Sequence, residues 1–222
     1  MAARICIIDY QRGNLASVRR GLQDAGYHAF ISDDPADILS ADGLVLPGVG
    51  SFADAMGILE ASGQADAIRE AAQAGTPLLG ICLGLQLLYD RGDEGCQPGQ
   101  FTPGLGLIPG LVTRMPAETA DGRRLKVPHV GWNSVAFTEA ENPLFAGVPD
   151  GSYFYFTHSF VGIPEDPSHA AGITRHAAPF ASTVRRGNVY ATQFHPEKSS
   201  TLGLRVLANF GRIVENHQAG VC

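Results

Sequence analysis

A cysteine held between two glycines is the residue in this sequence best suited to nucleophilic chemistry. Cys82 lies in Gly80-Ile-Cys-Leu-Gly84, directly after an apolar run. This spacing matches a nucleophile elbow, a sharp strand-to-helix turn whose flanking positions must be small because side chains there would collide. A thiol exposed at the start of a helix has a lowered pKa and reacts as the thiolate. The competing interpretation is a small buried cysteine in a glycine-rich turn.

A histidine and a glutamate far along the chain supply the groups that would activate such a thiol. They occur in Gln193-Phe-His-Pro-Glu197. Because residues two apart in an extended segment face the same way, we expect His195 and Glu197 to lie side by side. A carboxylate fixes the tautomer of an imidazole and stabilises the imidazolium that forms when the ring takes the thiol proton. With Cys82 they would form a triad, and the alternative is a surface histidine near a solvated glutamate.

A glycine-flanked turn supplies the third requirement of acyl transfer, an oxyanion hole. Pro47-Gly-Val-Gly50 follows a short apolar run. Such a turn can aim the backbone N–H of Val49 at the oxygen of a tetrahedral intermediate, with the N–H of Leu83 as the second donor. Each donor is worth about 100-fold in rate, so the geometry of this loop could control activity.

The elements that must position these residues alternate between strands and helices in the first half of the chain. Short β-rich runs predict strands at Arg4–Asp9, Gly43–Leu46 and Pro77–Ile81. Apolar residues at helical spacing predict helices from an Asn14 cap to Gly26, from Phe52 to Glu60 and from Gln64 to Ala74. Short apolar strands separated by amphipathic helices are typical of a parallel sheet covered on both faces.

The second half has a different composition. It is rich in Gly, Pro and aromatic residues, with extended runs at Val127–Val130 and Tyr153–Val161. Ala181–Arg185 and Val189–Phe194 flank a tight-turn signal and predict an antiparallel hairpin. A last amphipathic helix carries Leu202, Val206, Leu207, Phe210 and Ile213. We therefore predict one α/β domain over residues 1–222, with a central mixed, mostly parallel sheet, helices on both faces and a smaller antiparallel section.

The composition excludes several classes of protein. The chain carries 22 acidic against 16 basic residues, a net charge of −6 and a pI near 5.6, which offers little attraction for nucleic acid or anionic lipid. No apolar run reaches the roughly 18 residues of a membrane span. With no export signal and four scattered cysteines, we expect a cytoplasmic protein without disulfides.

No pattern in the sequence indicates a bound metal or cofactor. The cysteines lack CxxC spacing, and His169 and His176 lack a zinc-binding partner pattern. There is no P-loop, and Gly104-Leu-Gly-Leu-Ile-Pro-Gly110 does not have dinucleotide-binding spacing. We therefore expect no metal and no cofactor.

Taken together, the three motifs resemble those of class I (triad) glutamine amidotransferases. Further blocks resemble the glutaminase subunits of imidazole glycerol phosphate synthases, namely Pro128–Asn133, Tyr155–Phe160 and Lys198-Ser199. The motifs run in order from Asn14 to Ser199 and cover nearly the whole chain. The resemblance implies that Cys82 attacks the carboxamide of glutamine, that His195, oriented by Glu197, protonates the departing ammonia, and that water hydrolyses the glutamyl thioester.

The resemblance also implies binding roles for other residues. The positions that match those holding glutamine in the family are Gly48, Gly50, Gln86, Ser159 and Phe160. An interface with a (β/α)8 cyclase subunit is implied for Asn14, Trp132, Asn133, Tyr155 and Lys198. The alternative for Trp132 and Tyr155 is that they are ordinary core aromatics. In the resulting heterodimer, ammonia would pass to the cyclase, which makes imidazole glycerol phosphate and an aminoimidazole carboxamide ribotide (AICAR) in histidine biosynthesis.

Three interpretations stay open beside this one. The chain could be the glutaminase of another amidotransferase, such as pyridoxal phosphate synthase, or a γ-glutamyl hydrolase, although the Trp132 block and Lys198 argue against both. It could be a non-catalytic scaffold on the same fold. Arg123 and Arg124, with Lys126, form a basic run that is either a solvated loop or a contact with the cyclase subunit.

Overall fold

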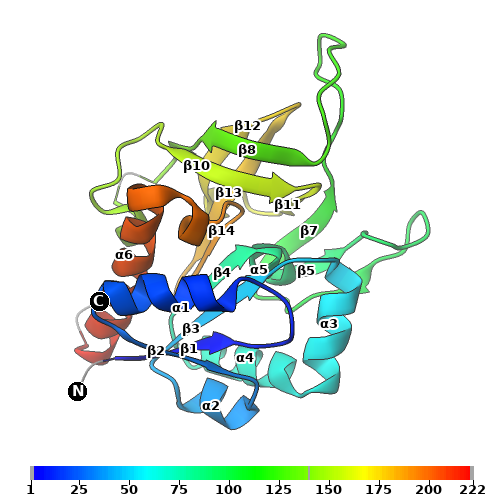
Figure 1. Cartoon of the computed structure of the whole chain (residues 1–222). Coiled ribbons are helices and arrows are strands. Elements are labelled where there is room, and N and C mark those ends of the chain that lie inside the picture. The colour runs from blue at the N-terminus through cyan, green and yellow to red at the C-terminus, as the bar shows by residue number, and fades with distance from the viewer. Residues whose placement is uncertain (1–2, 140, 221–222) are drawn as a thin grey trace.

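One large sheet organises the molecule. The structure, a computed structural model, describes residues 3–139 and 141–220. Its main sheet has eight strands in the order β2-β1-β3-β4-β14-β13-β12-β9 (Figure 1). The parallel strands are β1 (Arg4–Ile8), β2 (His28–Ser32), β3 (Gly43–Gly48), β4 (Leu78–Cys82) and β14 (Val189–Thr192). The antiparallel strands are β13 (Pro179–Arg186), β12 (Ala170–Arg175) and β9 (Ala136–Phe137).

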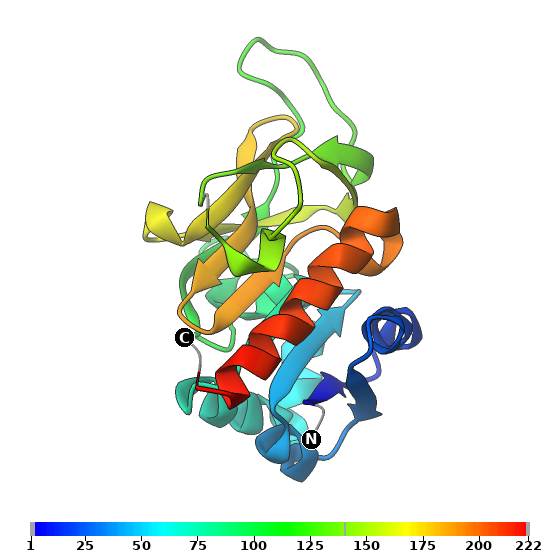
Figure 2. The same ribbon diagram turned by 90° about the vertical axis from the view of Figure 1, so that its left-hand side faces the viewer.

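Helices cover both faces of the parallel part, because its strands are apolar on both faces. Ile5 and Ile7 of β1 belong to one core cluster, while Cys6 and Ile8 belong to the other. The first cluster lies under α1 (Leu15–Asp24) and α6 (Ser200–Gln218). The second lies under α2 (Pro35–Ser40), α3 (Phe52–Ala61) and α4 (Gln64–Gln73). Figure 2 shows α6 crossing the sheet from end to end.

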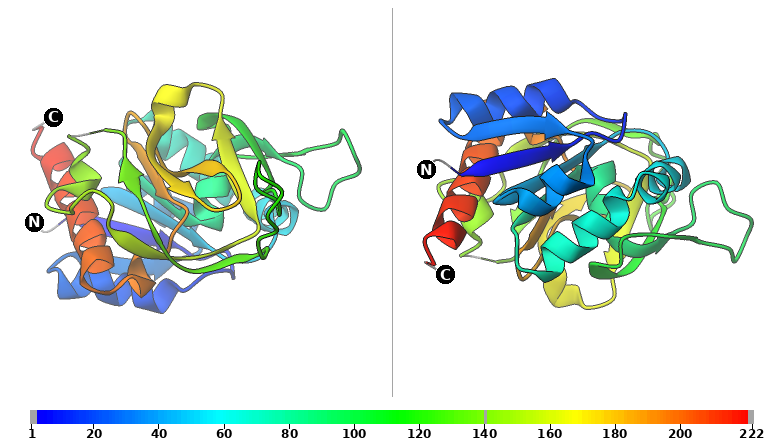
Figure 3. Two further views of the ribbon diagram at one scale, coloured as in Figure 1. Left: turned by 90° about the horizontal axis from the view of Figure 1, so that it is seen from above. Right: turned by 90° about the horizontal axis from the view of Figure 1, so that it is seen from below.

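Two smaller sheets complete the fold. One pairs β8 (His129–Ser134) with β10 (Tyr153–His158), and the other has the order β11-β7-β5-β6, formed by Phe160–Pro164, Ile108–Arg114, Tyr89–Gly92 and Thr102–Pro103. The remaining short elements are α5 (Leu83–Leu87), η1 (Pro143–Phe145), η2 (Pro167–His169) and η3 (Pro196–Lys198). Figure 3 shows α6 along one side of the molecule when it is seen from above (left), and α2 and α4 in front when it is seen from below (right).

The mixed, mostly parallel sheet with helices on both faces is confirmed, and so is a smaller antiparallel section. The single extended run predicted at Tyr153–Val161 is two strands, because β10 pairs with β8 and β11 pairs with β7, so the chain changes sheets at Ser159. The second small sheet also contains a parallel pair, β5 with β7. The Asn14 side chain makes no capping hydrogen bond to α1.

The predicted helices and the hairpin are confirmed, and where the sequence predicted their ends, the observed ends differ by at most two residues. Strand β2 and helix α2 were not predicted, because β2 is a half-buried edge strand and α2 has only 6 residues, too few to show a period. Within the described residues, no helix is both long and apolar enough to cross a membrane. Cys6, Cys82 and Cys96 are free thiols, while Cys222 lies outside the described residues.

Candidate active site

Three neighbouring parallel strands deliver the predicted groups to one edge of the sheet. β3 ends at Gly48 beside the predicted oxyanion loop, β4 ends at Cys82, and β14 ends shortly before His195. β4 lies between the other two. Ligands of open α/β sheets bind beyond the carboxyl ends of the strands. The topology therefore brings together groups that are far apart in the sequence.

The elbow at Cys82 has the steric reason that the sequence predicted. Cys82 ends β4 and directly precedes α5, and its φ of 56° is unusual for a residue with a side chain. A Cβ on Gly84 would lie 1.7 Å from the carbonyl oxygen of Leu46, and a Cβ on Gly80 would lie 2.9 Å from the Gly84 backbone. The two glycines therefore allow β4 and α5 to meet at this turn.

The thiol is not exposed in the way that the sequence predicted. Cys82 is only 6% exposed, because the segment from Thr157 to Phe160 lies across the elbow. The Cys82 sulfur lies 3.8 Å from the Thr157 carbonyl oxygen. Cys82 instead opens into a cavity of about 310 Å³, whose wall is formed by Val49, Gly50, Cys82, Leu83, Gln86, Glu94, Pro128, Thr157, His158, Ser159 and Phe160.

His195 and Glu197 are in contact, but not for the predicted reason. The Nδ1–H of His195 donates to Oε1 of Glu197 at 2.9 Å, with side chains 2% and 1% exposed. Residues Pro196–Lys198 form the 3-10 turn η3 rather than an extended segment. The turn folds the Glu197 carboxylate back onto the ring. The predicted pairing is therefore correct and the predicted backbone geometry is wrong.

This contact leaves the other ring nitrogen of His195 for the thiol. Nε2 of His195 is buried and has no hydrogen-bond partner at normal distance among the described residues. Burial lowers the pKa of the imidazole, but the attraction of Cys82 and Glu197 for the charged ring, through hydrogen bonding and charge, outweighs it and raises the pKa to about 9. The ring is therefore suited to stabilise a thiolate and to carry its proton.

Gln193 and Glu94 are among the polar side chains at the site to which the sequence analysis assigned no role. Gln193 Nε2 lies 3.8 Å from the Cys82 sulfur, and its Oε1 accepts from Gln86 Nε2 at 3.1 Å. Gln193 lies two residues before His195, a spacing that could have suggested a shared face. Glu94 lines the cavity and accepts from the backbone N–H of Phe52 at 2.7 Å. Burial raises the pKa of Glu94, and nothing in its local sequence marks it.

The predicted oxyanion and glutamine-binding residues gather at the same cavity, with one exception. Val49, Leu83, Gln86, Ser159 and Phe160 all line it, as does Gly50. Gly48 is buried behind the wall instead, paired with Cys82 across β3 and β4. A Cβ on Gly48 would lie 2.1 Å from the hydroxyl of Tyr10, so a side chain at this position would have to displace Tyr10.

The predicted interface residues lie on neighbouring elements at the rim of this cavity. Trp132 of β8 pairs with Tyr155 of β10, with ring centroids 6.3 Å apart, and Trp132 is 53% exposed, so it is not a core residue. The backbone N–H of His195, next to η3, donates to the Tyr155 carbonyl at 2.9 Å. η3 carries the exposed Lys198 and contacts α1, which follows Asn14.

Asn133 differs from the other predicted interface residues, because its side chain is bonded to the protein itself. It contacts His129 and donates to the Arg175 carbonyl at 2.9 Å. Arg123 and Arg124 are exposed on a hairpin that projects from the body next to β8 (Figure 1).

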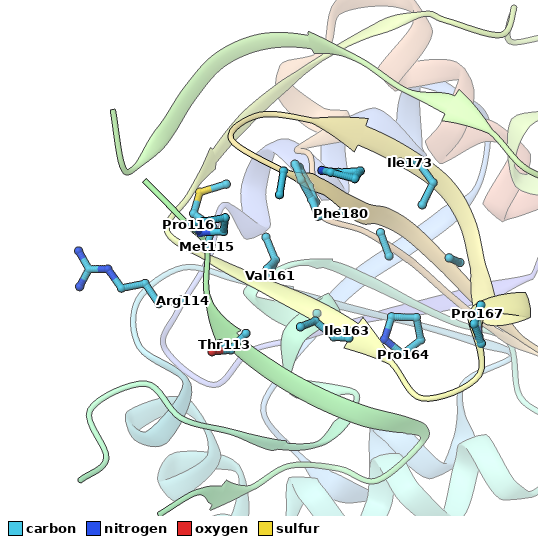
Figure 4. Close-up of a pocket in the computed structure, with 15 residues that line it drawn as sticks. Thr113, Arg114, Met115, Pro116, Val161, Ile163, Pro164, Pro167, Ile173 and Phe180 are labelled. Carbon is cyan, nitrogen blue, oxygen red and sulfur yellow. The ribbon is translucent and has the colours of Figure 1, made fainter. Parts of the chain in front are cut away.

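A second cavity, of about 470 Å³, lies between β11, β7, β12 and β13 (Figure 4). Its wall is mostly apolar, with Met115, Val161 and Phe180 among its residues, and Arg114 points away from it. No Cys, His, Asp or Glu is among the described residues that line it. The candidate chemistry therefore lies at Cys82.

Within the described ranges no cluster of three or more His, Cys, Asp or Glu is arranged to hold a metal. The lack of a metal and a cofactor stays a prediction.

A thiol at a strand–helix elbow, with an imidazole oriented by a carboxylate and a polar cavity beside it, is the arrangement of a cysteine enzyme that transfers or hydrolyses acyl groups. The model of the family "Glutamine amidotransferase class-I" matches residues 6–214. A protein of Moorella thermoacetica is 49% identical over 96% of this chain and 96% of its own length, and one of Symbiobacterium thermophilum is 51% identical over 96% and 95%. Both are named "Imidazole glycerol phosphate synthase subunit HisH". The chain belongs to the class-I glutamine amidotransferase family and, within it, to the HisH subunits of imidazole glycerol phosphate synthase.

Solved structures share the fold at much lower identity. The PurLQS structure of Thermotoga maritima has a TM-score of 0.70 at 19% identity, covering 98% of this chain and 100% of its own. A glutamine amidotransferase of the same organism has a TM-score of 0.65 at 16% identity, covering 98% and 86%. These likenesses support the fold alone.

Proposed function

We propose that this chain hydrolyses glutamine to glutamate and ammonia, and that it supplies the ammonia to a cyclase subunit that makes imidazole glycerol phosphate and AICAR in histidine biosynthesis. The observation that carries the proposal is the buried imidazole of His195, bonded to Glu197 through Nδ1 and with its Nε2 left for Cys82. The names of relatives at 49% and 51% identity support the same activity.

Glutamine binding follows from the polar groups of the cavity. The Glu94 carboxylate, whose pKa burial raises, suits the α-ammonium group of an amino acid, because an ammonium would replace part of its lost hydration. Gly50, Ser159 and Phe160 offer backbone groups on the wall, and Gln86 offers its carboxamide. The side chain of the bound amino acid would then extend toward Cys82.

The first chemical step acylates the enzyme. The Cys82 thiolate attacks the carboxamide carbon, and the electron pair of the C=O bond moves to oxygen. The backbone N–H groups of Val49 and Leu83 stabilise this oxyanion. As the tetrahedral intermediate collapses, the His195 imidazolium gives its Nε2 proton to the departing nitrogen, which leaves as ammonia. A glutamyl thioester on Cys82 remains.

The second step hydrolyses the thioester. His195, now neutral, takes a proton from a water molecule as the water oxygen attacks the thioester carbon. Collapse of the second tetrahedral intermediate returns the thiolate beside the imidazolium and releases the product as its carboxylic acid, which gives its proton to water to become glutamate. Glu197 holds the ring in the same tautomer throughout, so Nε2 serves as acid in one step and base in the other.

We also propose that a (β/α)8 cyclase subunit binds at the rim, so that ammonia passes between the subunits without meeting bulk water. Asn14, Trp132, Asn133, Tyr155 and Lys198 are the proposed contacts, and the exposed Trp132 is of the residue type enriched at interfaces. We assign no contact with the cyclase subunit to the basic hairpin that carries Arg123 and Arg124. The single domain over residues 1–222, the heterodimer and the cytoplasmic location stay predictions.

The test replaces Cys82 by Ala and measures synthesis in the complex with the cyclase subunit. We expect Cys82→Ala to abolish glutamine-dependent synthesis but to leave synthesis from ammonium salt at raised pH, where free ammonia exists. Cys96→Ser, a change of a partly exposed thiol outside the cavity, is the matched control and should keep both activities. Loss of both activities in Cys82→Ala, or retention of both, contradicts the proposal.

A further inference from the structure

A chain of hydrogen bonds leads from the edge strand β8 to the wall of the glutamine cavity. Asn133 Nδ2 lies 3.2 Å from Nε2 of His129, and Nδ1 of His129 lies 3.0 Å from Nε2 of His158. Nδ1 of His158 lies 2.9 Å from the carbonyl oxygen of Phe160. The mechanism above uses neither histidine, although His158 lines the cavity.

Each bond in this chain has a defined direction. The Phe160 carbonyl can only accept, so His158 Nδ1 carries the proton and its Nε2 accepts from the Nδ1–H of His129. The Nε2 of His129 then accepts from the Asn133 amide. The Asn133 orientation is fixed independently, because its Oδ1 accepts from the Ser134 N–H at 2.8 Å and its Nδ2 donates to the Arg175 carbonyl at 2.9 Å.

Burial keeps both rings neutral, which the chain requires. His129 and His158 are 5% and 6% exposed. Burial lowers the pKa of His129 to about 4 and that of His158 to about 3. The His129 ring lies 4.9 Å from Phe156 and 4.4 Å from His176, and the His158 ring lies 5.1 Å from Phe180. Two neutral imidazoles each supply one donor and one acceptor, so no polar ring atom is left over.

The cavity end of the chain orients a glutamine-binding side chain. The Phe160 carbonyl that accepts from His158 also accepts from Gln86 Nε2 at 3.0 Å. Gln86 in turn contacts Gln193, whose amide lies 3.8 Å from the Cys82 sulfur. The carbonyl therefore takes its position from two donors, one of which is His158.

We propose that His158 and His129 are positioning residues: the Asn133–His129–His158 chain fixes the Phe160 carbonyl, and through it the Gln86 carboxamide, in the geometry that binds glutamine. This proposal rests on the proposed glutaminase function. This series of hydrogen bonds starts at Asn133, next to the exposed Trp132 on β8. A change at Asn133, which does not line the cavity, is therefore felt in glutamine binding.

The test is steady-state glutaminase kinetics of the complex with the cyclase subunit. His158→Phe keeps a ring against Phe180 but donates nothing to Phe160. We expect it to raise KM for glutamine about 5- to 10-fold, the cost of one lost hydrogen bond, with little change in kcat. His158→Asn keeps a donor near the position of Nδ1 and should restore most of the affinity. Asn133→Ala should raise KM by a few-fold.

The matched control is His176→Phe. His176 stacks on His129 but lies outside the chain and contacts the Lys126 carbonyl through Nε2 at 2.9 Å. We expect it to keep the wild-type KM and kcat.

An unchanged KM in His158→Phe, or a KM in His158→Asn as high as in His158→Phe, overturns the proposal. If His158→Phe fails to fold, His158→Asn and Asn133→Ala decide, and wild-type KM in Asn133→Ala overturns it. Absence of glutamate release from wild type and His176→Phe would instead contradict the glutaminase function.

Discussion

The protonation of His195 depends on two neighbours that act against its burial. Burial alone would lower the pKa, yet hydrogen bonds and charges from Cys82 and Glu197 raise it to about 9 from 6.5. The imidazolium therefore persists through neutral pH and disappears as pH rises through about 9. Because the acylation step needs this proton for the departing ammonia, glutaminase activity should fall on the alkaline side near that pH.

Glu197→Gln tests this assignment. Gln keeps an oxygen that can accept from Nδ1–H but removes the negative charge, so the pKa of His195 falls and the alkaline limb of kcat/KM moves to lower pH. We also expect kcat to fall by roughly 100-fold or more, since an amide can hold the wrong tautomer. Glutamate release is measured from below pH 6.5 to above about 9, with exposed Glu215→Gln as control. An alkaline limb in the same place as wild type would contradict the role of Glu197.

Among single residues, the spacing in the sequence predicted the functional groups that lie close together along the chain or that follow a steric rule. The Gly80–Gly84 spacing identified Cys82, and the two-residue spacing identified the His195–Glu197 pair. Glu94 and the His129–His158 contact could not be predicted this way, because only the fold brings them to the site. His129 and His158 meet because β8 pairs antiparallel with β10.

At the scale of elements, the β4–α5 junction depends on a glycine that no other residue can replace. We expect Gly84→Ala to destabilise the protein by roughly 1–3 kcal/mol or more and to displace the nucleophile, because its Cβ would lie 1.7 Å from the Leu46 carbonyl oxygen. Gly57→Ala is the matched control. Gly57 lies inside α3 with nothing near the added Cβ, so Ala should stabilise the helix by about 0.5–1 kcal/mol.

Urea unfolding and glutamate release check both variants. The steric argument requires Gly84→Ala to lose stability and activity together, while Gly57→Ala gains stability and keeps activity. A Gly84→Ala variant as stable and active as wild type would show that the elbow tolerates a side chain, and the close approach of α5 to β3 would then not be required.

The sequence predicted elements well where a hydrophobic period extends over many residues. It predicted them poorly where the pairing of strands determines where an element ends. α3, α4 and α6 have 10, 10 and 19 residues, and their amphipathic pattern is visible in the sequence. The break at Ser159 is not, because β10 and β11 are both apolar and extended and differ only in their partners. The 3-10 turn η3 is likewise set by its tertiary contacts, since the Ser199 hydroxyl bonds both to the Tyr155 N–H and to the His195 carbonyl.

For the whole molecule, the order of the parallel strands accounts for the location of the site. β3, β4 and β14 are neighbours and point the same way, so the Val49 loop, Cys82 and His195 meet although β4 and β14 are separated by most of the second half of the chain. The smaller sheets then cover this edge and bury the thiol. Burial of the site lowers the pKa values of His129 and His158, whereas Cys82 and Glu197 raise that of His195 against its burial, with a consequence for stability.

We expect the combined contribution of His129, His158 and His195 to the free energy of unfolding to be greatest near pH 6.5. The pKa of His195 is raised to about 9, so its contribution is complete below 6.5 and is lost as pH rises toward 9. The pKa values of His129 and His158 are lowered to about 4 and about 3, so their contribution is present above 6.5 and is lost as pH falls toward 4. Each ring contributes a slope of at most about 1.4 kcal/mol per pH unit.

Urea unfolding of the wild type and His158→Phe at several pH values separates this effect from the carboxylates, which titrate on the acid side in both proteins. Removing one of the two rings that stay neutral in the folded state should make the acid-side loss shallower by up to about 1.4 kcal/mol per pH unit. His28→Gln, an exposed change on β2, should keep the wild-type slope. Equal acid slopes in wild type and His158→Phe would mean that the folded protein already protonates His158 above pH 4, which is incompatible with a neutral ring donating to Phe160 and accepting from His129.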